Sequence, residues 1–169
     1  MIDLKEIKNK IAKKENVYFL IIIFLIFSID RYSKIKIINN FSGTSFYLND
    51  FLNFDLVWNT GIGFGLLSSN SGIFYNIITF VIGSVIIFLT HLIIKADLKL
   101  KLFFSLIVGG ALGNFYDRIT YFAVPDFIDF HYGNFHWFTF NIADIFISTG
   151  IILLIFDDLL LKKNDTKNL

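Results

Sequence analysis

Long apolar runs separated by polar clusters dominate the pattern along the chain. Residues 73–94 form a run of 22 residues without Asp, Glu, Lys or Arg. A bilayer core about 30 Å thick needs about 20 apolar residues in a helix, so this run predicts a membrane span. Shorter runs at 17–29, 102–116 and 145–156 reach that length only if their bordering charges are included. The pattern predicts four transmembrane helices, at 17–38, 72–94, 100–118 and 141–161.

Composition supports an integral membrane protein of one domain. The 169 residues are 55% hydrophobic and only 17% charged, whereas soluble domains carry roughly 25% charged residues. The first apolar run follows a basic segment, but no small-residue cleavage site comes after it, so we interpret it as a retained helix. The absence of Cys excludes disulfides and thiol chemistry. No basic patch indicates a nucleic-acid partner.

The placement of lysine predicts the orientation. Eleven of the fifteen basic residues lie in residues 1–16, 95–101 and 162–167, and residues 39–70 and 119–139 contain none. Cytoplasmic loops are enriched in Lys and Arg, so we expect both termini in the cytoplasm. The segments 39–71 and 119–140 would then face outward. Partial alternation and Gly, Asn and Ser residues predict short strands in the first, and a loop or short strand in the second.

Polar side chains gather at the outer ends of the predicted spans. Carboxylates are costly at this depth, which makes them candidates for function. A structural role stays open for some of them, because Asp30 and Lys34 are spaced to pair on a helix. Asp117 beside Arg118 has the spacing to tie its helix to a neighbour. The candidates are Asp30, Lys34, Asn59, Asn114, Asp117, Arg118, Asp126, Asp129, Asn141 and Asp144.

Asn141 and Asp144 have the spacing of a helix cap, with an acid three residues after a good N-cap residue. The helix N-terminus would also stabilise an ionised Asp144. A second carboxyl nearby would be driven towards protonation, and such a pair activates water. Asp126 is the natural partner. Asp129 remains an alternative, because Pro125 would stiffen the approach or shift the register.

Several glycines mark close backbone approaches. Gly109 and Gly113 form a small-xxx-small pair, which favours helix packing, although a smooth surface for a substrate is the alternative. Gly61 begins a turn-rich stretch in which the backbone can approach a ligand closely.

Other classes of function fit less well. Asp126, Asp129, His131 and His136 include residue types that bind zinc, but neither an HExxH helix nor a compact histidine pair is evident, so we expect no metal and no cofactor. A Ser-His-Asp arrangement and a P-loop are also missing from the sequence. A transporter would place charges at the midplane and show inverted repeats, which this chain lacks. A helper protein that has lost activity is a further alternative, against which the intact aspartates argue.

Five short motifs occur along the chain in a fixed order. They are Asp30-Arg-Tyr-Ser-Lys34, Asn59-Thr-Gly-Ile-Gly-Phe64, Gly109-Gly-Ala-Leu-Gly-Asn114-Phe-Tyr-Asp117-Arg118, Val124-Pro-Asp126-Phe-Ile-Asp129 and Phe140-Asn141-Ile-Ala-Asp144. The set resembles bacterial lipoprotein signal peptidase, also called signal peptidase II. Each motif alone is weak, but five in order on four predicted spans are specific.

The resemblance implies four transmembrane helices with a small extracytoplasmic β-cradle. It implies an aspartic endopeptidase of the bacterial cytoplasmic membrane, with its site at the extracytoplasmic face. The implied substrates are diacylglyceryl-modified prolipoproteins, cleaved before the lipidated Cys, with membrane lipids as further partners. A monomer and sensitivity to globomycin are also implied.

By motif position, the resemblance also assigns the site residues. Asp126 and Asp144 would be catalytic. The residues that would shape the site or contact substrate are Asp30, Lys34, Asn59, Gly61, Asn114, Asp117, Arg118 and Asn141. Two departures stand out: Ile62 and Gly63 replace small alanines of the family, and Pro125 replaces a valine before Asp126.

Overall fold

The computed structural model describes residues 14–41, 43–61 and 72–165, with side chains up to residue 160. Interpretations that concern Ile62, Gly63 and the lysines before Lys14 lie outside these residues. The elements in chain order are α2 (Lys14–Phe41), β1 (Phe46–Asn49), β2 (Leu52–Asn59), α3 (Gly72–Lys95), α4 (Leu98–Tyr121), β3 (Val124–Tyr132), β4 (Phe135–Phe140) and α5 (Ile142–Asp165).

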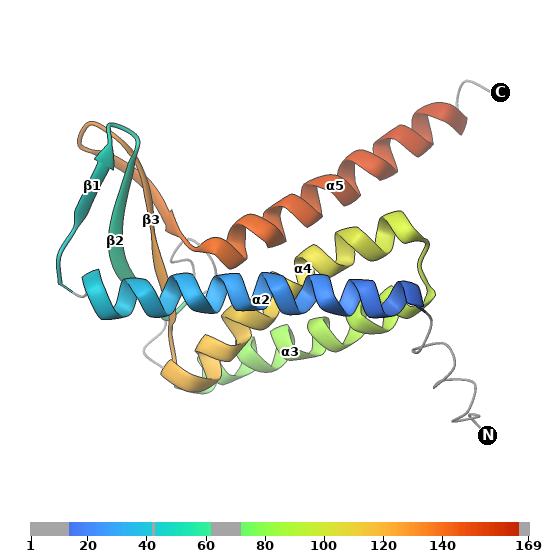
Figure 1. Ribbon diagram of the computed structural model, residues 1–169, viewed down its shortest axis with the longest axis horizontal. Helices are drawn as coiled ribbons and strands as arrows, with labels where there is room; N and C mark the ends of the chain where they lie inside the picture. Colours follow the sequence, from blue (N-terminus) through green and yellow to red (C-terminus); the bar gives the residue numbers. More distant parts are fainter. Residues whose placement is uncertain (1–13, 42, 62–71, 166–169) are drawn as a thin grey trace.

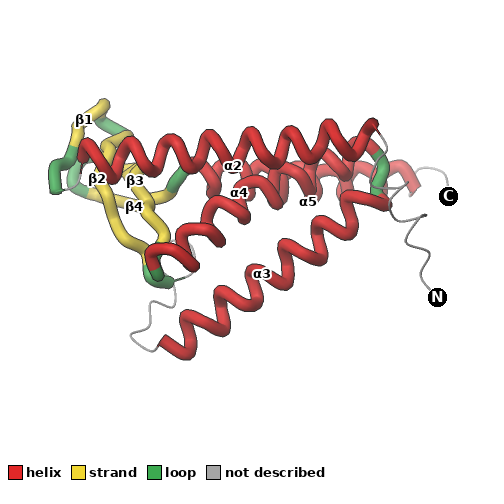
Figure 2. The backbone as a smooth tube through the Cα atoms, turned by 60° about the horizontal axis from the view of Figure 1, so that its bottom comes forward, coloured by secondary structure: helices red, strands yellow, loops and turns green. Residues whose placement is uncertain are grey.

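The long helices run side by side, and a four-stranded sheet lies at one end of them (Figures 1 and 2). α4 packs against α2, α3 and α5 and is therefore the centre of the bundle. Three of the described helices, α2, α3 and α4, are long and apolar enough to cross a membrane. The helices α2, α3 and α4 contain the predicted stretches 17–38, 72–94 and 100–118 and extend them by at most three residues at either end. The helix α5 begins one residue after the predicted 141 and ends four residues beyond 161.

One stripe along α2 faces the rest of the bundle. Apart from Arg31, its buried residues recur every three or four positions, which is the spacing of one helix face. Asp30 and Lys34 lie on this same stripe as Phe19, Ile23 and Ile26, so α2 directs both charges inward. The apolar part of the stripe packs with Ile86, Ile93 and Val108 in a common core.

Glycines allow α4 to approach two neighbours closely. A Cβ on Gly109 would lie 2.8 Å from Ile26 Cβ of α2, and one on Gly113 would collide with the carboxylate of Asp30. On another face, a Cβ on Gly110 would lie 2.5 Å from the carbonyl oxygen of Ala143 in α5. The packing role predicted for Gly109 and Gly113 is therefore confirmed.

The sheet joins two segments that are far apart in the sequence. All its strands are antiparallel in the order β1-β2-β3-β4. The pairing of β2 with β3 links the segment before α3 to the segment after α4, with Asn59 opposite Val124. Strands predicted within residues 39–71 are confirmed. The segment 119–140 holds a full hairpin, more than the loop or single strand expected.

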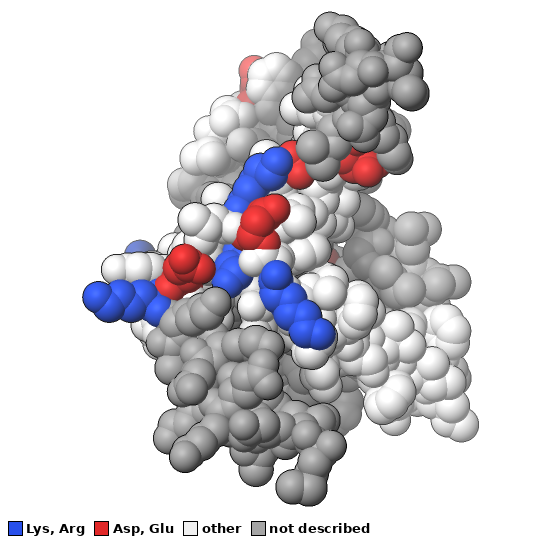
Figure 3. Space-filling model, turned by 90° about the vertical axis from the view of Figure 1, so that its right-hand side faces the viewer, with Lys and Arg blue, Asp and Glu red and all other residues white. Residues whose placement is uncertain are grey.

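The opposite end of the bundle carries charged side chains (Figure 3). Lys99 pairs with Asp157, and Lys101 Nζ lies 3.9 Å from the Glu15 carboxylate. α2 begins and α5 ends at this side, away from the sheet (Figure 1). The sheet and this charged end therefore lie on opposite sides of the apolar helices.

The close contact at Gly110 gives a first prediction. We expect Gly110→Ala to destabilise the protein by about 1–3 kcal/mol, because the new Cβ would press on the Ala143 carbonyl. Thermal unfolding in detergent measures the change. Gly72→Ala is the control, since an added Cβ there meets nothing within 4 Å. Equal melting temperatures for the two variants would contradict tight packing at Gly110.

Candidate active site

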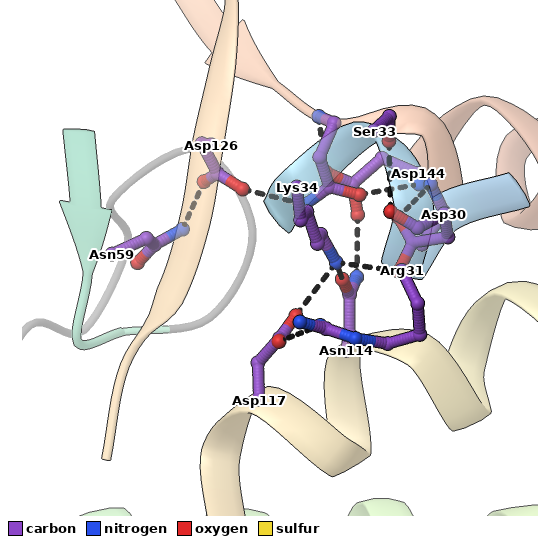
Figure 4. Close-up of polar contacts among 11 residues, drawn as sticks. Asp30, Arg31, Ser33, Lys34, Asn59, Asn114, Asp117, Asp126 and Asp144 are labelled. Carbon is purple, nitrogen blue, oxygen red and sulfur yellow. Dashed lines mark hydrogen bonds and ion pairs between the residues drawn. The ribbon is translucent and has the colours of Figure 1, made fainter. Parts of the chain in front are cut away.

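The carboxylates of Asp126 and Asp144 lie at the junction of the sheet and the helices (Figure 4), and Asn141 contacts both of them. The side-chain amide of Asn141 donates to Asp126 Oδ1 at 2.6 Å. Its backbone N–H donates to Asp144 Oδ2 at 3.1 Å. Asp126 comes from β3 and Asp144 from α5. One fully buried asparagine thus contacts both acids that the sequence analysis paired.

Local helix chemistry places Asp144. Asn141 Oδ1 accepts a hydrogen bond from the Asp144 backbone N–H at 3.1 Å, and the Asp144 carboxylate accepts from Asn141 in return. This reciprocal arrangement is the capping box predicted from the spacing, and it satisfies two backbone donors at the start of α5. The capping and site interpretations are compatible, because Asp144 has a second oxygen. That oxygen accepts from the Asn114 amide at 2.8 Å.

The alternation of side chains along β3 separates Asp126 from Asp129. Residues three apart in a strand point to opposite faces. The pairing of β2 with β3 shifts between Phe54 and Val57, and the extra residue lies on β2, so β3 itself keeps its alternation. Asp126 accepts hydrogen bonds from Asn141 and, at 2.9 Å, from Asn59. Asp129 instead contacts His136 at 2.7 Å. Pro125 is buried at the start of the strand opposite Trp58, and Asp126 remains the acid beside Asp144.

The environment of Asp126 favours its protonated form. Burial, and secondly the negative charge of Asp144, raise the pKa of Asp126 from 3.8 to about 6. The amides of Asn59 and Asn141 oppose this change by donating to the ionised carboxylate. Asp126 therefore keeps its proton to a pH about two units higher than an ordinary aspartate does.

A buried ion cluster lies beneath the two acids. Lys34 Nζ contacts Asp30 Oδ2 at 2.8 Å and Asp117 Oδ2 at 2.7 Å, and all three side chains are fully buried. The pairing of Asp30 with Lys34 and the link from Asp117 to a neighbouring helix are both confirmed. The cluster also reaches α5, because the Ala143 backbone N–H donates to Asp30 Oδ1 at 3.0 Å.

Asn114 connects the ion cluster to the acids. Its side-chain oxygen accepts from Lys34 Nζ at 2.7 Å, while its amide nitrogen donates to Asp144. Contact with the ammonium fixes the orientation of the amide, which leaves the nitrogen to face the carboxylate. Lys34 therefore acts on Asp144 through Asn114.

Arg118 and Gly61 form the other side of the site. Arg118 Nη2 donates to the Gly61 carbonyl oxygen at 2.6 Å, and the Gly61 N–H donates to Asn59 Oδ1 at 2.9 Å. The Nε and Nη1 atoms of Arg118 are buried without a hydrogen-bond partner among the described residues. Unpaired guanidinium donors next to a half-buried acid are available to a ligand.

An apolar groove ends at this polar group. Its volume is about 480 Å³, and its apolar walls come from α3, α4 and α5. The polar residues among those that line it are Asn114, Arg118, Asp144 and Ser148. An extended apolar segment with polar backbone at one end fits this distribution of side chains.

Comparisons with known proteins agree with the site. The family model for signal peptidase (SPase) II matches residues 22–160. A lipoprotein signal peptidase from Pelagibacter ubique (strain HTCC1062) is 47% identical over 165 residues, which covers 95% of this chain and 99% of that protein. One from Francisella tularensis subsp. mediasiatica (strain FSC147) is 44% identical over 153 residues, covering 86% and 93%. This chain belongs to the signal peptidase II family.

Two solved structures have the same fold. Both are described as a bacterial membrane enzyme structure by the in meso method, at 2.3 Å and 1.9 Å resolution. Each has a TM-score of 0.70, and the identities are 34% and 33%. The first match covers 89% of this chain and 91% of the other, and the second covers 84% and 92%. The chain is thus a multi-pass membrane protease that removes signal peptides from prolipoproteins.

All the predicted site residues lie in one connected network of this peptidase, whereas Asp129 lies outside it. The sequence analysis did not assign Arg31, Tyr75 or the Ala143 backbone. Arg31 pairs with Asp117, and the Tyr75 hydroxyl donates to the Arg118 carbonyl oxygen at 3.2 Å. Arg31 lies within the first motif, so its part in the site could have been predicted from the sequence. No sequence pattern around Tyr75 indicates its contact with Arg118.

The raised pKa of Asp126 gives a second prediction. The pKa of Asp126 in the folded protein, about 6, exceeds the ordinary pKa of 3.8. Protonation of Asp126 therefore contributes its full stabilisation of the fold at a pH below 3.8. That stability is lost as the pH rises through about 6. Because asparagine mimics the neutral acid, we expect Asp126→Asn to be more stable than the parent at about pH 8. The gap should close near pH 4.

Thermal unfolding at several pH values measures this gap. Asp55→Asn removes an exposed carboxylate from β2 and controls for the loss of one negative charge. A gap between Asp126→Asn and the parent of the same size at both ends of the pH range would contradict the raised pKa.

Proposed function

We propose that Asp126 and Asp144 are the catalytic pair of this peptidase. The observation that carries the proposal is that Asn141 contacts both carboxylates, one of which, Asp144, lines the groove. Two neighbouring carboxyls that share one proton can supply a base and an acid to the same reaction. The raised pKa of Asp126 supports such sharing.

The chemistry then follows the pattern of aspartic proteases. The ionised carboxylate removes a proton from water while the oxygen attacks the scissile carbonyl carbon. The protonated carboxyl donates a hydrogen bond to the carbonyl oxygen. As the C–N bond breaks, the leaving nitrogen takes a proton from the pair, and the pair regains its single shared proton.

The remaining site residues position the pair and the substrate. Asn59, Asn114 and Asn141 orient the carboxylates through their amides. Two donors of Arg118 have no hydrogen-bond partner among residues 14–41, 43–61 and 72–165, and we assign them to a carbonyl group of the substrate backbone. Gly61 holds the third arm of that guanidinium. Asp30, Lys34 and Asp117 support these residues from below.

The groove takes the apolar segment of the signal peptide. Its walls are apolar and its polar end carries Asp144, so the segment would lie along the helices with the scissile bond at the carboxylates. We propose diacylglyceryl-modified prolipoproteins as substrates, with cleavage before the lipidated Cys and the acyl chains among membrane lipids. A monomer suffices, because one chain supplies both acids.

We also propose four spans, with α5 as the fourth and with both termini in the cytoplasm. The helix α2 begins and the helix α5 ends on the side opposite the sheet (Figure 1), where charged side chains gather (Figure 3). The lysine-rich segments 1–16, 95–101 and 162–167 adjoin these helix ends in the sequence. Segments rich in Lys and Arg are typically cytoplasmic. The sheet and the acids would then face the extracytoplasmic side of the bacterial cytoplasmic membrane.

A cleavage assay tests the catalytic pair. Purified protein in detergent receives a diacylglyceryl-modified prolipoprotein, with the unlipidated precursor alongside, and products are followed by gel shift. We expect cleavage of the lipidated form only. Asp126→Asn and Asp144→Asn should each lower the rate by about 10³-fold or more, because each removes a proton-transfer group.

Asp55→Asn is the matched control and should cleave at the parental rate, since this carboxylate is exposed on β2. Full activity in either dyad variant would overturn the assignment. Activity that persists in Asp126→Asn but disappears in Asp129→Asn would move the role to Asp129.

Cysteine labelling tests the topology, since the chain has no native Cys. Single cysteines replace Asn134 in the β3–β4 turn, Ala96 between α3 and α4, and Leu160 near the end of α5. In spheroplasts, a membrane-impermeant maleimide should label only the Asn134→Cys variant. Labelling of Leu160→Cys before lysis would show that α5 does not cross the membrane.

A further inference from the structure

A second group of polar side chains lies on the sheet, away from the catalytic pair. Asp129, His131 and His136 each offer a ligand atom, and these atoms all lie within 4.8 Å of one another. Asp129 and His131 lie two residues apart on β3, so their side chains share a face. Asp126 points to the other face. Five residues of strand, roughly 16 Å, separate Asp126 from His131.

The hairpin register brings the two histidines together. His131 of β3 lies directly opposite His136 of β4, and their rings stack with centroids 5.3 Å apart. The register shifts between Phe130 and His131, where β4 has one extra residue. The sequence analysis saw no compact histidine pair and expected no metal. That expectation overlooked the hairpin, in which a two-residue turn at Gly133 and Asn134 sets His131 opposite His136.

Distances in the cluster are close to those around a bound ion. Zinc–ligand bonds of about 2.0–2.1 Å in tetrahedral geometry place ligand atoms roughly 3.3 Å apart. Asp129 Oδ2 lies 2.7 Å from His136 Nδ1 and 3.6 Å from His131 Nδ1. Adjustments of under about 1 Å would bring both pairs to the required separation, and His136 is exposed enough to move.

Internal hydrogen bonding leaves part of the cluster unsatisfied. His131 is nine-tenths buried, yet its Nδ1 has no hydrogen-bond partner within the described part of the chain. Asn53, opposite Asp129 on β2, has a buried side-chain oxygen in the same condition. If Asp129 pairs with His136 alone, His131 Nδ1 and Asn53 Oδ1 have no partner among the described residues. A buried polar atom without a partner typically costs about 1–3 kcal/mol. A cation at the cluster would satisfy His131.

We propose that Asp129, His131 and His136 bind a divalent transition-metal ion of the zinc type. Two imidazoles and one carboxylate suit zinc and its neighbours in the first transition series, whereas magnesium and calcium prefer oxygen ligands. Three protein ligands leave a fourth position for water. A hollow of about 430 Å³ beside His131, with Asp50 and Tyr132 in its lining, gives the ion a path from solvent.

The site is independent of the cleavage reaction. Its ligands lie on the opposite face of β3 from Asp126, and none of them contacts the catalytic pair in the described contacts. A bound ion would cross-link β3 to β4 and so stabilise the hairpin that ends at Asn141. The site therefore goes beyond the proposed function and stands or falls separately from it.

A zinc titration tests the proposal. The full chain, purified with a tag that contains no histidine and treated with a chelator, is titrated with Zn²⁺ by calorimetry. We expect about one equivalent to bind and the melting temperature to rise. His136→Gln should weaken binding by more than about tenfold, because loss even of an outer-shell partner commonly costs 10–100-fold. His136 is largely exposed, so this variant should fold.

His91→Gln is the matched control, because the chain has only three histidines and His91 lies on α3 outside the cluster. It should bind Zn²⁺ as the parent does. The absence of Zn²⁺ binding by the folded parent would overturn the proposal. Equal affinity in His136→Gln and the parent would also overturn it, as would loss of binding in His91→Gln.

Discussion

The buried ammonium of Lys34 is the charge on which the outer end of the helix bundle depends. Desolvating one ion costs several kcal/mol, so it is tolerated only with close partners. Asp30 and Asp117 supply two carboxylates, and Arg31 supplies the second positive charge that balances them. Since Asp30 also accepts from the Ala143 backbone, the cluster fixes α2, α4 and α5 at one height. Removing one member of such a cluster typically costs about 3–5 kcal/mol.

The two acids are held by neutral amides, although cations lie nearby. Asn114 stands between Lys34 and Asp144, and Asn59 and Asn141 hold Asp126. An adjacent cation would lower the pKa of a carboxyl strongly, whereas an amide orients it with a smaller effect. The arrangement gives fixed geometry while Asp126 keeps a raised pKa. The ion cluster holds the helices in place, and the asparagines keep its cations out of direct contact with the two acids.

Local patterns predicted the parts of this site that depend on neighbours in the sequence. The pairing of Asp30 with Lys34 follows from helical spacing, and the cap at Asn141 follows from a three-residue interval. The double contact of Asn141 with Asp126 required the position of β3, which local spacing does not fix. The face on which Asp129 lies and the meeting of His131 with His136 depend in the same way on strand pairing and on the two-residue turn of the hairpin. Register is set by pairing across the sheet, so these features emerge only in the folded chain.

The helices that form the groove are held in unequal ways. α4 is locked to α2 and α5 by glycine contacts, by ions and by the Ala143 backbone. α3 packs mainly against α4, through apolar side chains such as Ile86 and Ile93, and Figure 2 shows it diverging from α2. The free energy needed to widen the groove is therefore set mainly by this apolar packing and by the hydrogen bond from Tyr75 to the Arg118 carbonyl oxygen. A bulkier guest can be accommodated by displacement of α3, while the distance between the two acids stays unchanged.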